Sequence, residues 1–265
     1  MTDLPLAILF GLLIGVALGA LGGGGSILAV PALVYGLGLP LREAIQTSLL
    51  VVGITAATAA WAHVRAGTVW IRTALAFAGV GVLGSFAGAW LNHRVDEGVV
   101  LGGLAVLMVV AAVGMWRRGG TVIPTVVPLS GGPAVDVRER RIGDRLPQVL
   151  AAGAGLGVLT GLFGVGGGFL IVPTMVLLVG VPTQAAIGTS LVVISANAGA
   201  GFLAHLGMGS VDMAVAAAFA AGGVVGAFVG QCAGSRVSAG TLSRAFALLV
   251  LSVGSYTLFD VLMRG

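Results

Sequence analysis

The feature that most constrains this chain is an internal duplication. Residues 15–49 align without a gap to residues 157–191 at a constant offset of 142 positions, and 17 of the 35 aligned residues are identical. Glycine, proline and hydroxyl positions match as well as apolar ones, and the register continues to Arg94 and Arg236. Chance similarity between apolar segments does not keep polar and proline positions aligned over such a length. The two halves are therefore predicted to share one structural unit.

Composition places both units in a lipid bilayer. The chain is 58% hydrophobic and only 8% charged, whereas a soluble domain has about a quarter of its residues charged. Residues 98–116 carry no charge at all, and this run is close to the roughly 20 residues that a helix needs to cross hydrocarbon. With so few charges the chain cannot cover a water-exposed surface, so an integral membrane protein is predicted.

The predicted fold is all-α, a polytopic membrane protein of two inverted repeats. Each repeat holds a broken re-entrant helical segment plus three transmembrane helices. The first repeat covers residues 1–116, the second covers 147–265, and a polar inter-repeat loop with nine charged residues covers 117–146. The eight apolar segments are expected at about 5–38, 43–63, 69–91, 98–116, 147–180, 185–206, 211–233 and 241–263.

The first segment of each repeat is interrupted by glycines. Gly22–Ser26 and Gly164–Gly168 lie in the middle of these segments, and Pro31 or Pro173 follows within two turns. Consecutive glycines disfavour a helix, and irregular backbone at membrane depth is tolerated only where protein buries it or a wet cavity hydrates it. Two short helices joined by extended backbone are predicted, entering and leaving on the same face.

The arginines indicate that the two repeats are inverted. The loop after the second segment carries Arg65 and Arg72 in the first half but only Asp212 in the second, whereas the loop after the third segment carries Arg236 and Arg244 in the second half. Basic loops face the cytoplasm. This pattern fits three crossings per half, with a cytoplasmic central loop and both termini outside.

Inverted repeats with broken helices in matching positions predict a substrate site at the bilayer midplane. Glycine-rich backbone leading into a half-helix exposes unpaired N–H groups, and the helix dipole adds partial positive charge, which favours an anion. The alternative is that the glycines only allow close helix packing. The candidate backbone donors are Gly22, Gly23, Gly24, Gly25, Ser26, Gly164, Gly166, Gly167 and Gly168.

Repeated polar side chains are further candidates. Hydroxyl groups can bind an anion without burying a charge, or they can bond back to their own helix. Asn197 lies deep in its segment, and its amide needs either a neighbouring helix or a substrate as a partner. The candidate hydroxyls are those of Thr47, Ser48, Thr189 and Ser190.

His63 and His205 are repeat counterparts near the ends of their segments. Either could take part in proton coupling, although an interfacial position at a helix end is the favoured interpretation. An aromatic belt at the membrane interfaces is expected to hold Trp61, Trp70, Trp90 and Trp116.

Other classes of function lack the residues they need. Cys232 is the only cysteine, and the nine acidic residues fall at segment ends or in loops. No catalytic constellation, metal site or cofactor is therefore expected, and the arginines fit a topology signal better than a nucleic-acid surface.

The glycine motifs resemble a known family. The pattern Gly-x-x-Gly-x-Gly-Gly-Gly-Phe-x-x-Val-Pro at Gly161–Pro173, with Ala186-x-Gly188-Thr189-Ser190 after it, is similar to the TauE/SafE family of sulfite exporters, and Gly19–Pro31 repeats it. The first half departs from the pattern at Ser26 and Gln46. The resemblance implies a multi-pass protein of a bacterial or archaeal inner membrane that moves sulfite or related organosulfur anions.

Together these features predict a secondary transporter of a small sulfur-containing anion. It would export the anion by alternating access between the two inverted halves, driven by the membrane potential or by protons. An anion channel is the alternative, and a membrane enzyme or assembly subunit is a third hypothesis.

Overall fold

The computed structural model describes residues 4–117, 146–176, 181, 183–207, 211–234 and 239–264. Every regular element in these residues is helical, as predicted, and seven of the helices are long and apolar enough to cross a membrane. Most of the predicted inter-repeat loop lies outside the described residues. The first half contains α1 (Leu4–Leu21), the 3-10 helix η1 (Gly24–Leu28), α2 (Ala29–Pro31), the π-helix η2 (Ala32–Gly36), α3 (Leu41–Arg65), α4 (Ile71–Asn92) and α5 (Glu97–Arg117). The second contains α7 (Leu146–Phe163), α8 (Gly168–Thr174), α9 (Thr183–Ala204), α10 (Met213–Gly234) and α11 (Ala239–Arg264).

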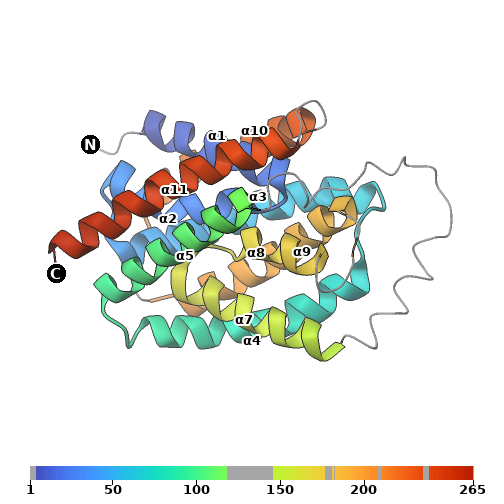
Figure 1. Cartoon of the computed structure of the whole chain (residues 1–265), viewed down its shortest axis with the longest axis horizontal. Helices are drawn as coiled ribbons and strands as arrows, with labels where there is room; N and C mark the ends of the chain where they lie inside the picture. Colours follow the sequence, from blue (N-terminus) through green and yellow to red (C-terminus); the bar gives the residue numbers. More distant parts are fainter. Residues whose placement is uncertain are drawn as a thin grey trace.

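The two repeats are inverted, as the arginine pattern predicts. Helices α3 and α9 are repeat counterparts and pack against each other. Gly53 of α3 lies against Ala198 of α9, whereas Leu49, earlier in α3, lies against Gly201, later in α9. The two helices therefore run antiparallel, and so do the counterparts α5 and α11 (Figure 1). Equivalent helices that run in opposite directions require a two-fold relation between the halves.

The first segment of the first half is re-entrant. After α1 the chain turns back, and Gly36 at the end of η2 lies against the ring of Phe10 in α1. The start of α1 and the end of α11 lie at the same end of the molecule (Figure 1). The connection between α1 and η1 is not the extended backbone that was predicted. Gly22 and Gly23, with φ angles of 68° and 123°, reverse the chain in two residues, and a 3-10 turn follows at once. Glycine makes this possible because it adopts positive φ without steric strain.

The repeats exchange their first helices. Helix α1 packs along α10 of the second half, and α7 packs along α4 of the first half (Figure 1). Small residues allow this close approach: a Cβ on Gly15 would lie 2.9 Å from the Cα of Gly223, and a Cβ on Gly157 would lie 2.8 Å from the Cα of Gly81. These contacts obey the rule that membrane helices associate through small residues. The first helix of each half therefore packs mainly against the other half.

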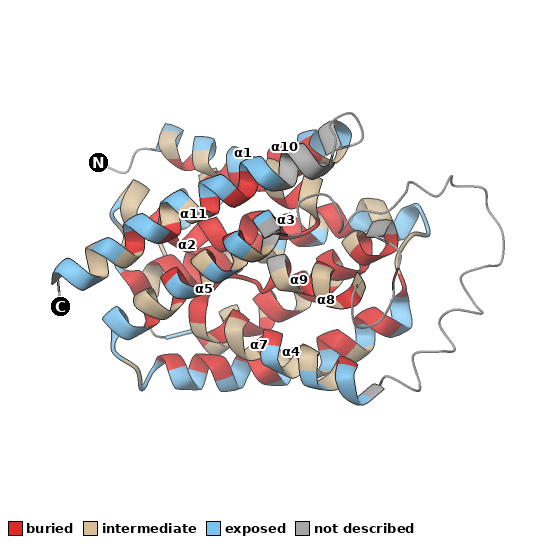
Figure 2. Ribbon diagram, viewed as in Figure 1, coloured by how far each residue is buried: buried red, intermediate tan, exposed pale blue. Residues whose placement is uncertain are grey.

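Exposed residues lie on the outer faces of this bundle and buried ones fill its middle (Figure 2). The exposed set includes large apolar side chains such as Leu75 and Leu83, which suits contact with lipid rather than with water. Three of the four tryptophans, at positions 61, 90 and 116, are exposed as an aromatic belt requires. Trp70 is instead buried, because the turn before α4 folds against the opposite repeat, so its predicted place in the belt is wrong.

Candidate functional site

The two glycine segments, residues 22–26 and 164–168, meet inside the bundle, and we call them the glycine loops. A Cβ on Gly168 would lie 2.6 Å from the carbonyl oxygen of Gly23 and 2.8 Å from its Cα. A Cβ on Gly23 would lie 2.9 Å from the Cα of Gly168. The loops therefore touch through their main chains, with one loop contributed by each repeat.

The loops are held in equivalent environments. Gly22 and Gly164 are repeat counterparts with φ angles of 68° and 69°. Ile187 of α9 packs on Gly22, and its counterpart Ile45 of α3 packs on Gly164. The two-fold relation between the halves therefore extends into the site itself.

Two serines bond the loops crosswise. The Ser48 Oγ donates to the carbonyl oxygen of Gly164 at 2.7 Å. The Ser190 Oγ lies 2.8 Å from the carbonyl oxygen of Gly22 and 2.8 Å from that of Ile187 in its own helix, so its single hydrogen is shared between the two. Each serine thus bonds the loop that belongs to the other half. Both side chains are fully buried. Of the four hydroxyls singled out in the sequence, these two have a protein partner that already accounts for their burial.

The two threonines beside the serines differ from each other. The Thr189 Oγ1 accepts a hydrogen bond from the backbone N–H of Trp70 at 3.0 Å. The Thr47 Oγ1 is buried and has no partner among the described residues. The repeat counterpart of Trp70 is Asp212, whose carboxylate caps α10 by accepting from the Ala214 N–H at 2.9 Å. The Thr47 hydroxyl therefore has no described partner, whereas the Thr189 oxygen accepts one hydrogen bond and its own O–H is still available to donate.

A second symmetric pair of polar groups lies deeper in α3 and α9. Asn197 of α9 is fully buried against Gly81 of α4, and its repeat counterpart Thr55 of α3 is buried against Gly223 of α10. In the described part of the chain, neither the Asn197 amide nor the Thr55 hydroxyl has a hydrogen-bond partner. A buried polar group without a partner is destabilising by about 1–3 kcal/mol, so both groups need an explanation beyond their described neighbours. The sequence analysis did not single out Gly81, although its repeat counterpart is also a glycine, Gly223.

The backbone of the second glycine loop also supplies donors. The first amide of α8 to bond along the helix is that of Leu170, which donates to the Gly167 carbonyl at 3.2 Å. The amides of Gly167 and Gly168 therefore precede the first hydrogen-bonded turn. In the first loop Ser26 stands in place of Gly168, and its Oγ donates to the Gly23 carbonyl at 2.9 Å. The two loops are thus not chemically equal.

The two candidate histidines occupy different settings. The His63 Nδ1 lies 3.2 Å from the Thr68 Oγ1. His205 is only 1% exposed, its Nδ1 lies 2.8 Å from the Gly201 carbonyl oxygen, and its own carbonyl oxygen accepts from the Gln46 Nε2 at 2.6 Å. His205 directly follows the last residue of α9, so it lies at a helix end, but its side chain is buried inside the protein.

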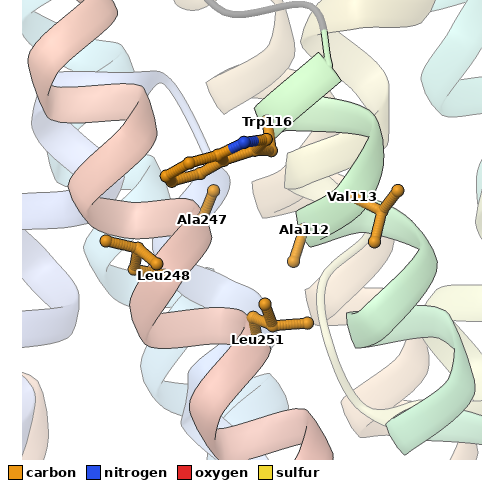
Figure 3. A pocket seen from close by; sticks show the side chains of 6 residues that line it. All are labelled: Ala112, Val113, Trp116, Ala247, Leu248 and Leu251. Atoms are coloured by element: carbon orange, nitrogen blue, oxygen red, sulfur yellow. The ribbon is translucent and has the colours of Figure 1, made fainter.

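A hollow lies between α5 and α11 (Figure 3). Its lining is almost wholly apolar, so it offers nothing that would select a charged ligand. Among the described residues, no group of three His, Cys, Asp or Glu side chains is placed to hold a metal. The hollow is lined by Ala112, Val113, Trp116, Ala247, Leu248 and Leu251.

Comparisons with known proteins agree over nearly the whole chain. The family model "Sulfite exporter TauE/SafE" matches residues 7–257. The chain is 36% identical to a "Probable membrane transporter protein" of Xylella fastidiosa (strain 9a5c), over 93% of this chain and 92% of that one. It is 24% identical to the "Probable membrane transporter protein YunE" of Bacillus subtilis, over 96% of each chain. No solved structure matches the chain significantly.

Proposed function

The chain belongs to the sulfite exporter TauE/SafE family, and on this premise we propose that it is a secondary transporter that exports a small sulfur-containing anion. The observation that carries the proposal is the crosswise bonding of the two glycine loops by Ser48 and Ser190. A site to which two inverted halves each contribute one loop is the arrangement expected for alternating access. Rocking one half against the other would expose the site first to one side of the membrane and then to the other.

Neutral donors around the loops suit a small anion that must be released again. The donors we assign to the substrate are the amides of Gly167 and Gly168, the Thr47 hydroxyl and the Asn197 amide. Oriented amides at a chain reversal attract negative charge without a buried cation. No arginine is among the buried polar residues in the described part of the chain. Neutral dipoles would bind the anion more weakly than a fixed positive charge would. Weak binding lets the anion leave the site, which a transporter needs in every cycle.

The unequal threonines suggest how the two ends alternate. The Trp70 N–H to Thr189 bond closes one end of the bundle, and the equivalent bond from the Asp212 N–H to Thr47 is not made. Because the halves are related by a two-fold axis, contacts at one end have counterparts at the other. We propose that the Thr47 bond forms when the Thr189 bond breaks, so that the two ends close in turn.

The orientation in the membrane follows from the arginines. The end of α3 and the start of α4 carry Arg65 and Arg72, so we place this end in the cytoplasm, together with the central loop. Both termini then lie outside the inner membrane. An inside-negative potential favours export of anions by about 2.3 kcal/mol per charge per 100 mV.

Uptake into liposomes tests the proposal. Purified protein is reconstituted, and uptake of sulfite, sulfoacetate, thiosulfate and taurine is measured with and without a pH gradient, using protein-free liposomes as the control. We expect sulfite or sulfoacetate to enter well above the control. Taurine should enter more slowly, because its ammonium group removes the net negative charge. If none of the four compounds moves faster than in the control, the transporter proposal fails.

A further inference from the structure

His205 presents a buried ring nitrogen that no protein group uses. It follows Ala204, the last residue of α9, and its Nδ1 lies 2.8 Å from the Gly201 carbonyl oxygen. A carbonyl can only accept, so Nδ1 carries the hydrogen and Nε2 holds a lone pair. The Nε2 atom is buried without a partner within the described chain. A lone pair in this position is ready to receive a proton.

Gln46 contacts the backbone of His205 and carries a second unpartnered acceptor. Its Nε2 donates to the His205 carbonyl oxygen at 2.6 Å, which binds the start of α3 to the end of α9. Its Oε1 is buried and, like the His205 Nε2, meets no described donor. Two buried acceptors on neighbouring residues are unfavourable together unless a donor is supplied. A proton on the His205 Nε2 would turn one of these acceptors into a donor.

The repeat counterpart of this pair is built differently. His63 corresponds to His205, but its Nδ1 lies 3.2 Å from the Thr68 Oγ1. Gly188 corresponds to Gln46 and has no side chain, and a Cβ there would lie 2.9 Å from the Cβ of His63. The first-half histidine therefore faces no amide. Among the residues whose side chains the structure describes, a buried carboxamide contacts the backbone of a residue with a buried imidazole at the end that holds His205.

The pKa of the His205 imidazole is shifted below its usual value, chiefly by burial. Burial lowers the pKa of His205, the nearby His93 lowers it further, and the hydrogen bond to the Gly201 carbonyl partly opposes this shift. The other charged groups at this end of the bundle include Glu43, in the first turn of α3, and Asp96, just before α5. Arg42 pairs with Glu97 at 3.2 Å, Arg94 lies over the Trp90 ring, and Asp212 caps α10.

We propose that His205 and Gln46 form a proton-binding site in which a proton on the His205 Nε2 binds together with the transported anion. The inference rests on the proposed function, because the anion is its second ligand. The positive imidazolium and the anion stabilise each other, so each raises the affinity for the other by the same factor. The anion should therefore bind more tightly as the pH falls through the pKa of His205, and its presence should raise that pKa.

A titration of the histidines tests the proton site without any transport. The protein has three histidines, so isotope-labelled histidine in nanodiscs gives three signals, which the variants His63→Gln and His93→Gln assign. We expect the His205 signal to titrate below the usual range for histidine, and its midpoint to rise when sulfoacetate is added, since the sulfonate group stays ionised throughout. A His205 signal with no titration between about pH 4.5 and 8, or with a midpoint that sulfoacetate leaves in place, would overturn the proposal.

Transport by matched variants separates this inference from the proposed function. In liposomes, lowering the pH from 7 to 5 should raise wild-type sulfoacetate uptake by about tenfold, within the usual range of coupling between two sites. His205→Gln should remove this dependence, and Gln46→Gly, which copies the residue at the repeat counterpart, should weaken it. His63→Gln should retain it. Wild-type uptake whose pH profile survives His205→Gln overturns the proton site alone, whereas absence of wild-type uptake counts against the transporter itself.

Discussion

Replacing Gly168 by alanine should abolish transport and strongly destabilise the protein. The new Cβ would lie 2.6 Å from the carbonyl oxygen of Gly23 and 2.8 Å from its Cα. Both atoms belong to the main chain, so no rotamer change relieves the contact, and the two glycine loops would have to separate. Overpacking of this kind is destabilising by about 1–3 kcal/mol, and we expect the upper end of that range. Thermal unfolding in nanodiscs and anion uptake in liposomes measure the two effects.

Gly199→Ala on the neighbouring helix α9 is the matched control. A Cβ at Gly199 meets nothing within 4 Å, and alanine favours a helix over glycine by about 1 kcal/mol. This variant should be as stable as the wild type or more so, with normal uptake. Wild-type stability and uptake in Gly168→Ala would show that the loops do not touch as described.

Removing the crosswise serine bonds should have the next largest effect. Ser48→Ala leaves the Gly164 carbonyl without its donor, and Ser190→Ala does the same to the Gly22 carbonyl. A buried group that loses its partner is destabilising by about 1–3 kcal/mol. Because the Ser190 hydroxyl shares its hydrogen with the Ile187 carbonyl, we expect a smaller loss from Ser190→Ala than from Ser48→Ala, and the largest loss from the double variant. Thermal midpoints measured without substrate report these losses directly.

Two further variants show whether the serines hold the loops or bind the anion. The Ser252 Oγ donates to the Leu248 carbonyl of its own helix on an exposed face, so Ser252→Ala should be nearly neutral. The Thr47 hydroxyl is buried without a described partner, so Thr47→Val should preserve or raise stability while weakening anion binding. If Ser48→Ala and Ser190→Ala leave stability intact and only weaken anion binding, the serines are ligands and their structural assignment here is wrong.

The fold was largely predictable because the duplication and the arginines constrain it together. An offset of 142 pairs Gly22 with Gly164 and Ser48 with Ser190. The arginines lie in non-equivalent loops of the two halves, which indicates that the two copies are inverted. The crosswise contacts could not be predicted in this way. Sequence comparison identifies counterparts, but in a two-fold arrangement Ser48 bonds the loop of the other half. The loop carbonyl that Ser48 contacts can be identified only when the position of the two-fold axis between the halves is known.

Candidate site residues were named from the sequence, but the hydrogen-bond partners of their side chains could not be. Ser48 and Thr47 are adjacent and equally polar, yet one donates to a loop carbonyl and the other has no described partner. The direction in which each side chain points depends on the packing of α3 against α9, which composition does not specify. Trp70 was missed because its backbone N–H, rather than its ring, contacts the site. Every residue except proline has a backbone N–H group, so the residue type does not reveal which of these groups donates to the site.

Counterflow in liposomes tests alternating access most directly. Vesicles containing the purified protein are loaded with concentrated unlabelled sulfite or sulfoacetate, whichever the uptake assay selects, and diluted into a trace of the same labelled anion with the membrane potential clamped at zero. A carrier that exposes its site to one side at a time should accumulate label inside above the outside concentration, before the level decays. Label that only rises to equilibrium, without this overshoot, would show a channel and contradict the account.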